Sequence, residues 1–372
     1  MIFWFFLYIL TFLFSLVSKN RIYLVWFVIW LITVFRYKVG TDYMGYVELY
    51  NTFGSQYFNT HYESDIGLMS LMTFFHSIGG TPQILFFTYG SLTCYFFYKA
   101  FHFYARGNNV LEMIFVNLYM GFLFFQTLNI IRFMLAAAII FYSTKYIVKK
   151  KPIKYLAYIS FAAIFHFTAI LFLPLYLIRY LKVGRWTLFV FVLIIACIVI
   201  IHPTEDVLLR MLNLNSQYSY YLTNEKYVNL QVSTFGILNT VLYTIIAFII
   251  YKYFRHDRLL SIIFLFYLTF IISRFLAIDI YIFQRISQYF KPFLIVGLGY
   301  AILNLKLRNI AKTLIIFLLI FTVHIGALLG LYLRNPVQKR FYSQYAINIG
   351  LLGKSIPIQI YGDYNTLPDY WE

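Results

Sequence analysis

FRYKVGTDYMGYVELY, residues 35–50, follows two apolar segments near the start of a strongly hydrophobic chain. Polar, charged and aromatic side chains crowd into this stretch, namely Arg36, Lys38, Gly40, Thr41, Asp42, Tyr43 and Tyr46. A chain with so few polar groups has few places where it leaves hydrocarbon. The stretch therefore marks such a place, and the apolar segments around it are predicted to carry further polar groups to the same side of a membrane.

The composition predicts an integral membrane protein. The chain has 372 residues, of which 62% are hydrophobic and 12% are charged, and its mean hydropathy is +0.75. Soluble domains are about half apolar and about a quarter charged. The apolar runs are continuous rather than alternating, which indicates helices and not a β-barrel. We expect an all-α polytopic protein with one transmembrane domain over residues 1–372 and about 11–13 spanning helices.

The formal charge of +17 would indicate nucleic acid as a partner in a soluble protein. In a membrane protein most of this charge orients the helices, and we expect no nucleic-acid partner. Cys94 and Cys197 lie inside apolar runs and imply neither a disulfide nor a metal site. The sequence has no Gly-rich phosphate loop, no HExxH motif and no paired-aspartate motif, so neither a cofactor nor a metal is expected.

A lysine cluster sets the predicted orientation. It consists of Lys149, Lys150, Lys151 and Lys154, and the positive-inside rule places it in the cytoplasm. The loops at about 36–82 and 202–233 and the tail at about 334–372 then lie outside. Within the first loop, residues 66–79 are apolar but too short to span, which predicts a re-entrant or interfacial helix.

Residues 154–180 are too long for one comfortable helix, and two interpretations remain open. One is a single tilted helix. The other is a pair of short segments that turn near His166, with Pro174 beyond the turn. The basic residues that follow, Arg179, Lys182 and Arg185, are better placed in the cytoplasm, which favours the broken pair.

Four arginines lie at the predicted outer ends of apolar helices, where orientation gives no reason for them: Arg36, Arg132, Arg274 and Arg285. A charge near hydrocarbon is costly and usually faces a cavity or a charged partner. Guanidinium groups bind phosphate oxygens through two parallel hydrogen bonds. Together the four indicate an anionic, lipid-borne ligand such as a pyrophosphate, although each alone could snorkel to outer-leaflet headgroups.

Other candidate site residues each have a plain structural alternative. His166 could act as a base or bind a sugar hydroxyl, or it could be a hydrogen-bonded packing residue. Asp42 could accept a proton from an acceptor hydroxyl, or it could only shape a turn. Glu63 could be a helix-start charge. Tyr289 lies one turn after Arg285, on the same face.

These motifs together resemble the EpsG-like branch of the Wzy polysaccharide polymerases. The matching pieces are FRYKVGTDYMGY, YESDIG, LNIIRFMLAAAIIFYSTKYIVKKK, IFHFTAILFLPLY and QRISQYF, and they occur in the family's order. The pattern RxxxGTDYxxY is the specific one, and NxxRxxLA followed by FHxTA adds weight. Phe133 departs from the family, which usually has Gln after the arginine, so any role of that position is in doubt here.

The resemblance implies a metal-independent, inverting glycosyltransferase with a GT-C-like fold. Donor and acceptor would both be oligosaccharides on undecaprenyl pyrophosphate, joined at the outer (periplasmic or exterior) face of a bacterial cytoplasmic (inner) membrane. Products of the family include O-antigen of lipopolysaccharide, capsule and exopolysaccharide. The lipid bilayer is then a partner, and a chain-length regulator and a flippase are candidate partners.

The resemblance also leads to an assignment of roles. Positioned cations usually supply the largest catalytic term when charge develops, so the four arginines Arg132, Arg274, Arg285 and Arg36 are predicted to bind pyrophosphate. Asp42 or His166 would orient or deprotonate the acceptor hydroxyl. The acceptor and its sugars are assigned to Gly40, Thr41, Tyr43, Tyr46, Glu63 and Tyr289.

Two other classes of protein were weighed. A membrane O-acyltransferase that decorates surface polysaccharide would also use an intramembrane histidine, but its basic site should face the cytosolic acyl donor. A lipid-linked glycan flippase should have charges along many helices and no long outer loop such as 202–233. The outward placement of the arginines therefore argues against the first class, and the long outer loop argues against the second.

Overall fold

A computed structural model gives the fold of the protein. It describes residues 2–17, 22–53, 66–201, 234–304, 309–333, 345–351 and 357–361. The chain divides into two compact units. The first comprises residues 1–146, 151–174 and 307–372, and the second comprises residues 147–150 and 175–306. Glu63 and the predicted outer loop at 202–233 lie outside the described residues.

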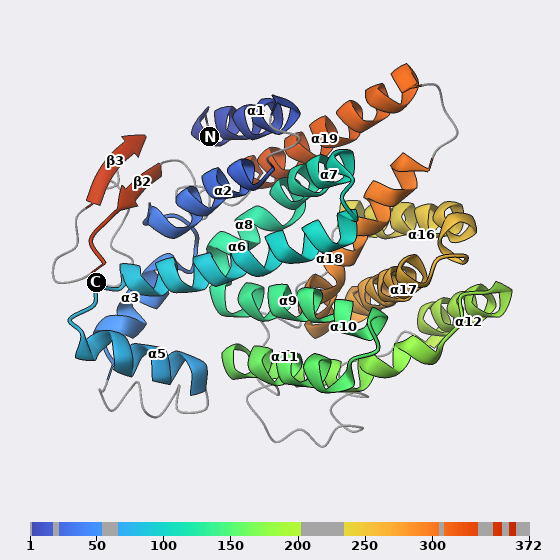
Figure 1. The fold of residues 1–372 in the computed structure, drawn as a ribbon, viewed down its shortest axis with the longest axis horizontal. Coiled ribbons are helices and arrows are strands. Elements are labelled where there is room, and N and C mark those ends of the chain that lie inside the picture. Colours follow the sequence, from blue (N-terminus) through green and yellow to red (C-terminus); the bar gives the residue numbers. More distant parts are fainter. Residues whose placement is uncertain are drawn as a thin grey trace. The chain divides into compact units, whose positions relative to one another are not determined.

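The first unit contains most of the helices. They are α1 (Ile2–Val17), α2 (Tyr23–Phe35), α3 (Tyr43–Asn51), α5 (Ile66–Ser77), α6 (Gln83–Ala105), α7 (Asn109–Tyr119), the π-helix η1 (Met120–Phe124), α8 (Phe125–Asn129), α9 (Ile131–Ser143), α11 (Pro152–Phe165) and α19 (Asn309–Tyr332). Helix α6 packs against α2 and α9, and α9 packs against α11 (Figure 1). Apart from Arg132 near its start, helix α9 is mostly apolar, and it is almost wholly buried, as expected of a central helix in a membrane bundle.

A small antiparallel sheet joins the C-terminal segment to the start of the chain. Strand β1 (Arg36–Tyr37) pairs with β2 (Tyr345–Asn348), which also pairs with β3 (Pro357–Tyr361). Nearby, Thr81 donates its backbone N–H to Leu351 O at 2.9 Å and its hydroxyl to Gly350 O at 2.5 Å. The C-terminal segment is thus fixed to the end of α2 and the start of α6.

At two breaks in the helices, the backbone N–H group still finds a hydrogen-bond acceptor nearby. His166 adopts an extended conformation (φ −155°, ψ 109°) between α11 and the 3₁₀ helix η2 (Phe167–Tyr180). This confirms the broken pair over residues 154–180. Ile130 (φ −86°, ψ 64°) separates α8 from α9, and its N–H still donates to Gln126 O at 3.0 Å. Such breaks are tolerated at membrane depth only where the freed groups find partners.

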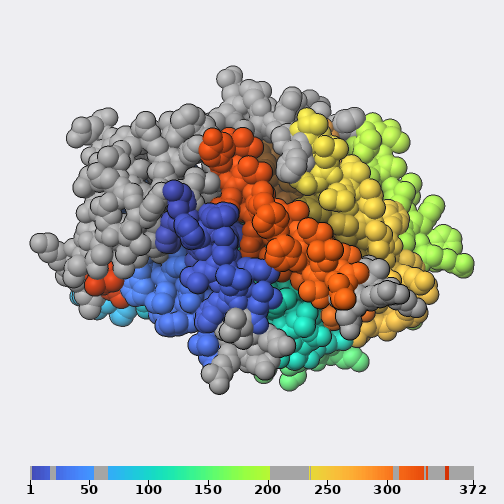
Figure 2. Space-filling model, turned by 90° about the horizontal axis from the view of Figure 1, so that it is seen from above, coloured from blue at the N-terminus to red at the C-terminus, as the bar shows by residue number. Residues whose placement is uncertain are grey.

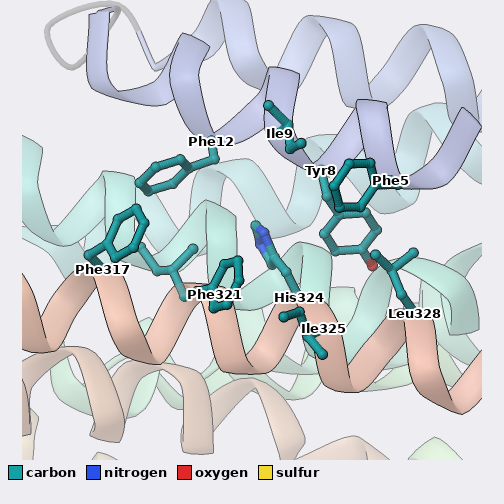
Figure 3. Close-up of a pocket in the computed structure, with 10 residues that line it drawn as sticks. Phe5, Tyr8, Ile9, Phe12, Phe317, Phe321, His324, Ile325 and Leu328 are labelled. Atoms are coloured by element: carbon teal, nitrogen blue, oxygen red, sulfur yellow. The ribbon is translucent and has the colours of Figure 1, made fainter. Parts of the chain in front are cut away.

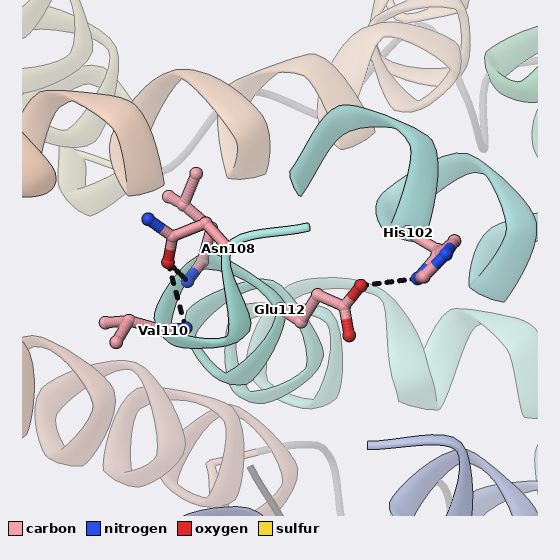
Figure 4. A network of polar contacts seen from close by, with 5 residues as sticks. His102, Asn108, Val110 and Glu112 are labelled. Carbon is pink, nitrogen blue, oxygen red and sulfur yellow. Dashed lines mark hydrogen bonds and ion pairs between the residues drawn. The ribbon is translucent and has the colours of Figure 1, made fainter. Parts of the chain in front are cut away.

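The turn between α6 and α7 is closed by side chains (Figure 4). Asn108 is the N-cap of α7, and its Oδ1 accepts from the N–H groups of Val110 and Leu111 at 3.0 and 3.1 Å. Glu112, in the first turn of α7, lies 2.5 Å from His102 Nδ1 near the end of α6. These contacts tie together the adjoining ends of α6 and α7.

Helix α19 lies alongside α1 (Figure 2), and it also packs against the π-helix η1. Tyr8 donates to Met120 O at 2.8 Å, and His324 Nε2 lies 3.0 Å from Asn117 O. An apolar pocket of about 60 Å³ lies between α1 and α19, with His324 and Tyr8 in its wall (Figure 3). A Cβ on Gly121 of η1 would lie 2.1 Å from Val323 Cγ1, so glycine allows this close approach.

The second unit contains α12 (Arg185–Ile201), α16 (Thr234–Phe254), α17 (Arg258–Asp279) and α18 (Ile282–Leu303). Helices α17 and α18 form its most extensive contact, and Phe266 stacks on Phe293 with ring centroids 4.4 Å apart. Helix α18 continues through Pro292. Asp257 caps α17 by accepting from Leu260 N at 3.0 Å.

The prediction of an all-α polytopic membrane protein is confirmed, while the number of spanning helices and the GT-C-like fold stay predictions. Among the described residues, six helices are long and apolar enough to cross a membrane, and six further apolar helices have 10–17 residues. Helix α5, at 12 residues, has the length expected of the short re-entrant or interfacial segment at 66–79. The description as one transmembrane domain over residues 1–372 stays a prediction.

The close approach of η1 and α19 gives a stability prediction. Gly121→Ala should lower the free energy of unfolding by about 1–3 kcal/mol, because the added methyl overpacks against Val323. Gly326→Ala on α19 is the matched control, since a Cβ there meets nothing within 4 Å. Thermal unfolding in detergent measures both variants. Equal melting temperatures for the two would contradict the packing described for Gly121.

Candidate functional site

The loop between β1 and α3 has an unusual backbone conformation. Lys38 and Gly40 both have positive φ, at 53° and 101°. A Cβ on Gly40 would lie 2.9 Å from Leu128 O and 3.2 Å from Asn129 Oδ1. Glycine is therefore required by the conformation and by the close approach of the α8 backbone. The loop is pressed against the end of α8.

Asn129 holds this loop. Its Oδ1 accepts from Thr41 Oγ1 at 2.9 Å and from the backbone N–H of Asp42 at 3.0 Å. Asn129 is the last residue of α8, directly before the break at Ile130. Asn129 is the first residue of the NxxRxxLA pattern in the sequence, but the pattern alone assigned no role to it.

Asp42 begins α3 but does not cap it with its side chain. It is the N-cap residue, in αR conformation (φ −94°, ψ −2°), and makes no side-chain cap hydrogen bond. Its Oδ1 instead lies 3.1 Å from the hydroxyl of Thr41. The backbone-bonded turn expected of a purely structural aspartate is thus absent at Asp42, and its half-buried carboxylate retains further acceptor capacity.

Tyr43 packs inside the unit. Its ring stacks on Phe86 at 4.2 Å, and its hydroxyl donates to Gln83 Oε1 at 3.1 Å. Gln83 in turn donates to Val34 O at 2.7 Å. Burial raises the pKa of Tyr43 above its usual value, while the charge of Arg36 acts in the opposite direction. Tyr43 remains a neutral donor that connects α3 to α6 and α2.

Arg36 is completely buried, with 0% of its surface exposed. Its Nη1 donates to Thr33 O at 2.6 Å, and its guanidinium lies 4.8 Å from the Phe86 ring centre. A buried cation needs such contacts to offset its lost hydration. In this position Arg36 fixes the end of α2, where the chain turns into β1.

Arg132 and His166 approach the same region from α9 and the break after α11. The half-buried Arg132 has its guanidinium 5.9 Å from the ring centre of Tyr46, on α3. The next residue, Phe133, meets the edge of His166 with ring centroids 5.2 Å apart. His166 Nδ1 lies 2.7 Å from Thr168 Oγ1. The position that departs from the family thus packs against a candidate base.

The far end of α3 is clamped to α5 by a stack of three rings. His76 lies between Tyr50 and Phe53, with ring centroids 4.2 and 4.9 Å away and both interplanar angles at 17°. Its Nε2 is 3.0 Å from Tyr50 O, so this nitrogen carries a proton, because a carbonyl only accepts. Tyr50 also donates to Gly80 O at 2.8 Å. Sequence reasoning missed this contact.

The remaining predicted residues lie elsewhere. Arg274 and Arg285 belong to the second unit. Arg274 donates to Thr240 Oγ1 at 3.3 Å and to Gly236 O at 3.2 Å, which fastens the start of α16. Arg285 is exposed in the first turn of α18, whereas Tyr289 is buried, with 1% of its surface exposed.

The first unit therefore brings together seven of the predicted site residues, namely Arg36, Gly40, Thr41, Asp42, Tyr43, Tyr46 and Arg132, with His166 against Phe133. This arrangement offers a carboxylate and a cation on adjoining elements. In the described part of the chain, no group of three or more His, Cys, Asp or Glu residues could hold a metal ion.

Comparison with known proteins gives one match. The family model described as the EpsG family matches residues 19–347, which is most of the chain. EpsG-like proteins are Wzy-type polymerases. No curated protein and no solved structure matches the chain significantly.

The close approach at Gly40 gives a second prediction. Gly40→Ala should destabilise the loop by more than the ~1–2 kcal/mol that a left-handed conformation costs, because its methyl also meets Leu128 O. Gly79→Ala is the matched control, with φ 68° and nothing within 4 Å of an added Cβ. Thermal unfolding in detergent should therefore separate the two variants. If Gly79→Ala were less stable than Gly40→Ala, this result would contradict the loop geometry described at Gly40.

Proposed function

The chain belongs to the EpsG family, and from this premise we propose that it polymerises lipid-linked oligosaccharide repeat units at the outer face of a bacterial cytoplasmic membrane. The family match carries the proposal, because EpsG-like proteins are Wzy-type polymerases. The apolar helices support the lipid bilayer as the setting. Donor and acceptor are proposed to be oligosaccharides on undecaprenyl pyrophosphate.

The proposed reaction is one glycosyl transfer with inversion. The terminal hydroxyl of one lipid-linked glycan attacks the anomeric carbon of the other. The bond from that carbon to the pyrophosphate oxygen breaks, and undecaprenyl pyrophosphate leaves with the bonding electrons. A side chain of the protein takes the proton of the attacking hydroxyl.

Arg132 is proposed to stabilise the leaving pyrophosphate. It is a half-buried cation beside α3. It lies on α9, the helix that follows Asn129, which contacts the loop at residues 38–42. A guanidinium that meets charge as it forms in a water-poor site is worth more than one in bulk water. Arg274 and Arg285 are also proposed to bind the pyrophosphate. Arg36 is proposed to act indirectly, by holding the end of α2.

Asp42 is proposed as the group that orients and deprotonates the acceptor hydroxyl, with His166 as the alternative. Support comes from the Asp42 carboxylate, which is not used to cap α3 and is anchored beside Thr41 and Asn129. Tyr46, half-buried on α3, is available for sugar contacts. Tyr43 and Gly40 act by shaping the loop, since one is buried and the other is pressed against α8.

Arg132→Ala tests the leaving-group role. We expect a loss of about 10²- to 10³-fold in polymer formation, because one positioned charge donor is removed. The measurement is the polysaccharide ladder in a polymerase-null strain complemented at matched membrane levels. Arg185→Ala, an exposed arginine at the start of α12, is the control and should keep the full ladder. A full ladder from Arg132→Ala would overturn the assignment.

Asp42→Asn and His166→Gln separate the two candidate bases. Asp42→Asn should lower turnover by about 10²- to 10⁴-fold, because the carboxylate that takes the proton is lost. The controls are Glu48→Gln, at an exposed acid on the same helix, and His102→Gln. Initial rates of polymerisation across pH give the comparison. A normal rate for Asp42→Asn together with a loss for His166→Gln would move the role to His166.

A further inference from the structure

The carboxamide of Asn129 has a fixed orientation. One atom of this group, Oδ1, accepts from both the hydroxyl of Thr41 and the backbone N–H of Asp42, at 2.9 and 3.0 Å. A backbone N–H can only donate, so the atom it meets is the amide oxygen and not the nitrogen. The planar NH₂ group therefore points away from residues 41–42.

This NH₂ group makes no hydrogen bond to the part of the chain that the structure describes. Asn117 shows the contrast, because its NH₂ group donates to Ser15 Oγ at 2.9 Å and to Met113 O at 2.8 Å. Asn129 is half-buried, and its two donors are held in place by an oxygen already engaged. A preorganised donor of this kind suits an oxygen-bearing ligand.

The neighbouring charged groups indicate what kind of ligand oxygen would accept from this NH₂ group. Asn129 contacts the first residue of the α3 region, Asp42, and Arg132 lies against Tyr46, four residues later. Asn129 and Arg132 therefore both lie beside the start of α3. An NH₂ donor and a guanidinium on one side favour an anionic oxygen over a sugar hydroxyl.

We propose that Asn129 is a substrate-binding residue, whose Nδ2 donates a hydrogen bond to a phosphate oxygen of the lipid pyrophosphate while its Oδ1 positions Asp42. The inference rests on the proposed function and adds a second pyrophosphate-binding side chain beside Arg132. It also couples the two halves of the reaction, because one carboxamide contacts the leaving group and holds the loop that carries the base.

The test uses a substitution that separates the two ends of this amide. Asn129→Asp keeps oxygens that accept from Thr41 and Asp42 but has no NH₂ donor. Asn108→Asp is the matched control, because Asn108 Oδ1 accepts from two N–H groups in the same way, at 3.0 and 3.1 Å. Aspartate serves equally well as an N-cap, so this control should behave as wild type. Asn129→Ser is a second, uncharged variant that also lacks the NH₂ group.

The measurement is the affinity of the full-length protein in nanodiscs for undecaprenyl pyrophosphate without glycan. We expect Asn129→Asp and Asn129→Ser to bind at least about tenfold more weakly, as for a lost hydrogen bond to a charged group, with Asn108→Asp unchanged. Wild-type affinity in Asn129→Ser would overturn the inference, whatever Asn129→Asp does, because the added charge of aspartate by itself weakens binding of an anion. This outcome includes the case in which Asn129 contacts only the acceptor sugar.

Arg132→Ala in the same assay distinguishes failure of this inference from failure of the proposed function. Loss of binding in Arg132→Ala, with wild-type binding in Asn129→Ser, would reject the role of Asn129 alone. A wild-type protein that does not bind undecaprenyl pyrophosphate would reject both. Thermal unfolding of each variant shows whether the protein is folded, and Asn129→Ser supplies the answer if Asn129→Asp is not.

Discussion

Backbone groups in hydrocarbon must find hydrogen-bond partners within the protein, and the breaks in the first unit at Ile130 and His166 meet this constraint. The loop at 38–42, the break at Ile130 and the extended residue His166 are joined by side-chain contacts. Gly40 lies against α8, Asn129 receives the N–H of Asp42, and Phe133 meets His166. Irregular backbone is therefore concentrated where it can present polar groups, and continuous helices surround it.

Much of the fold follows from the sequence, because long apolar runs permit few structures in a membrane. The broken pair over 154–180 was predictable for the same reason, since its length exceeds one span and basic residues follow it. The pairing of β1 with β2 was not, because Arg36 and Ile347 are far apart in sequence and a two-residue strand has no periodic signal. The contacts of Asn129, the first residue of the NxxRxxLA pattern, with residues 41–42 were hidden for a related reason. Its partners lie in another segment of the chain.

The four arginines show a limit of reasoning from topology alone. The positive-inside rule concerns depth along the membrane and does not distinguish a buried cation from an accessible one. In the structure Arg36 is fully buried on Phe86, Arg132 is half-buried beside Tyr46, and Arg285 is exposed. Side chains that the sequence treats as equivalent thus have different surroundings. Arg36 lies at the end of α2 and donates to Thr33 O, whereas Arg132 lies beside α3, where we propose that it meets the ligand.

The strand pairing between Arg36–Tyr37 and residues 345–348 also has a consequence for biosynthesis. The ribosome makes β1 early and its partner strand β2 only after all the helices described have been made. The loop at residues 38–42 and the strand before it therefore lack β2 while the later helices insert. The strand pairing that precedes the loop at 38–42 can therefore form only after residues 345–348 have been made.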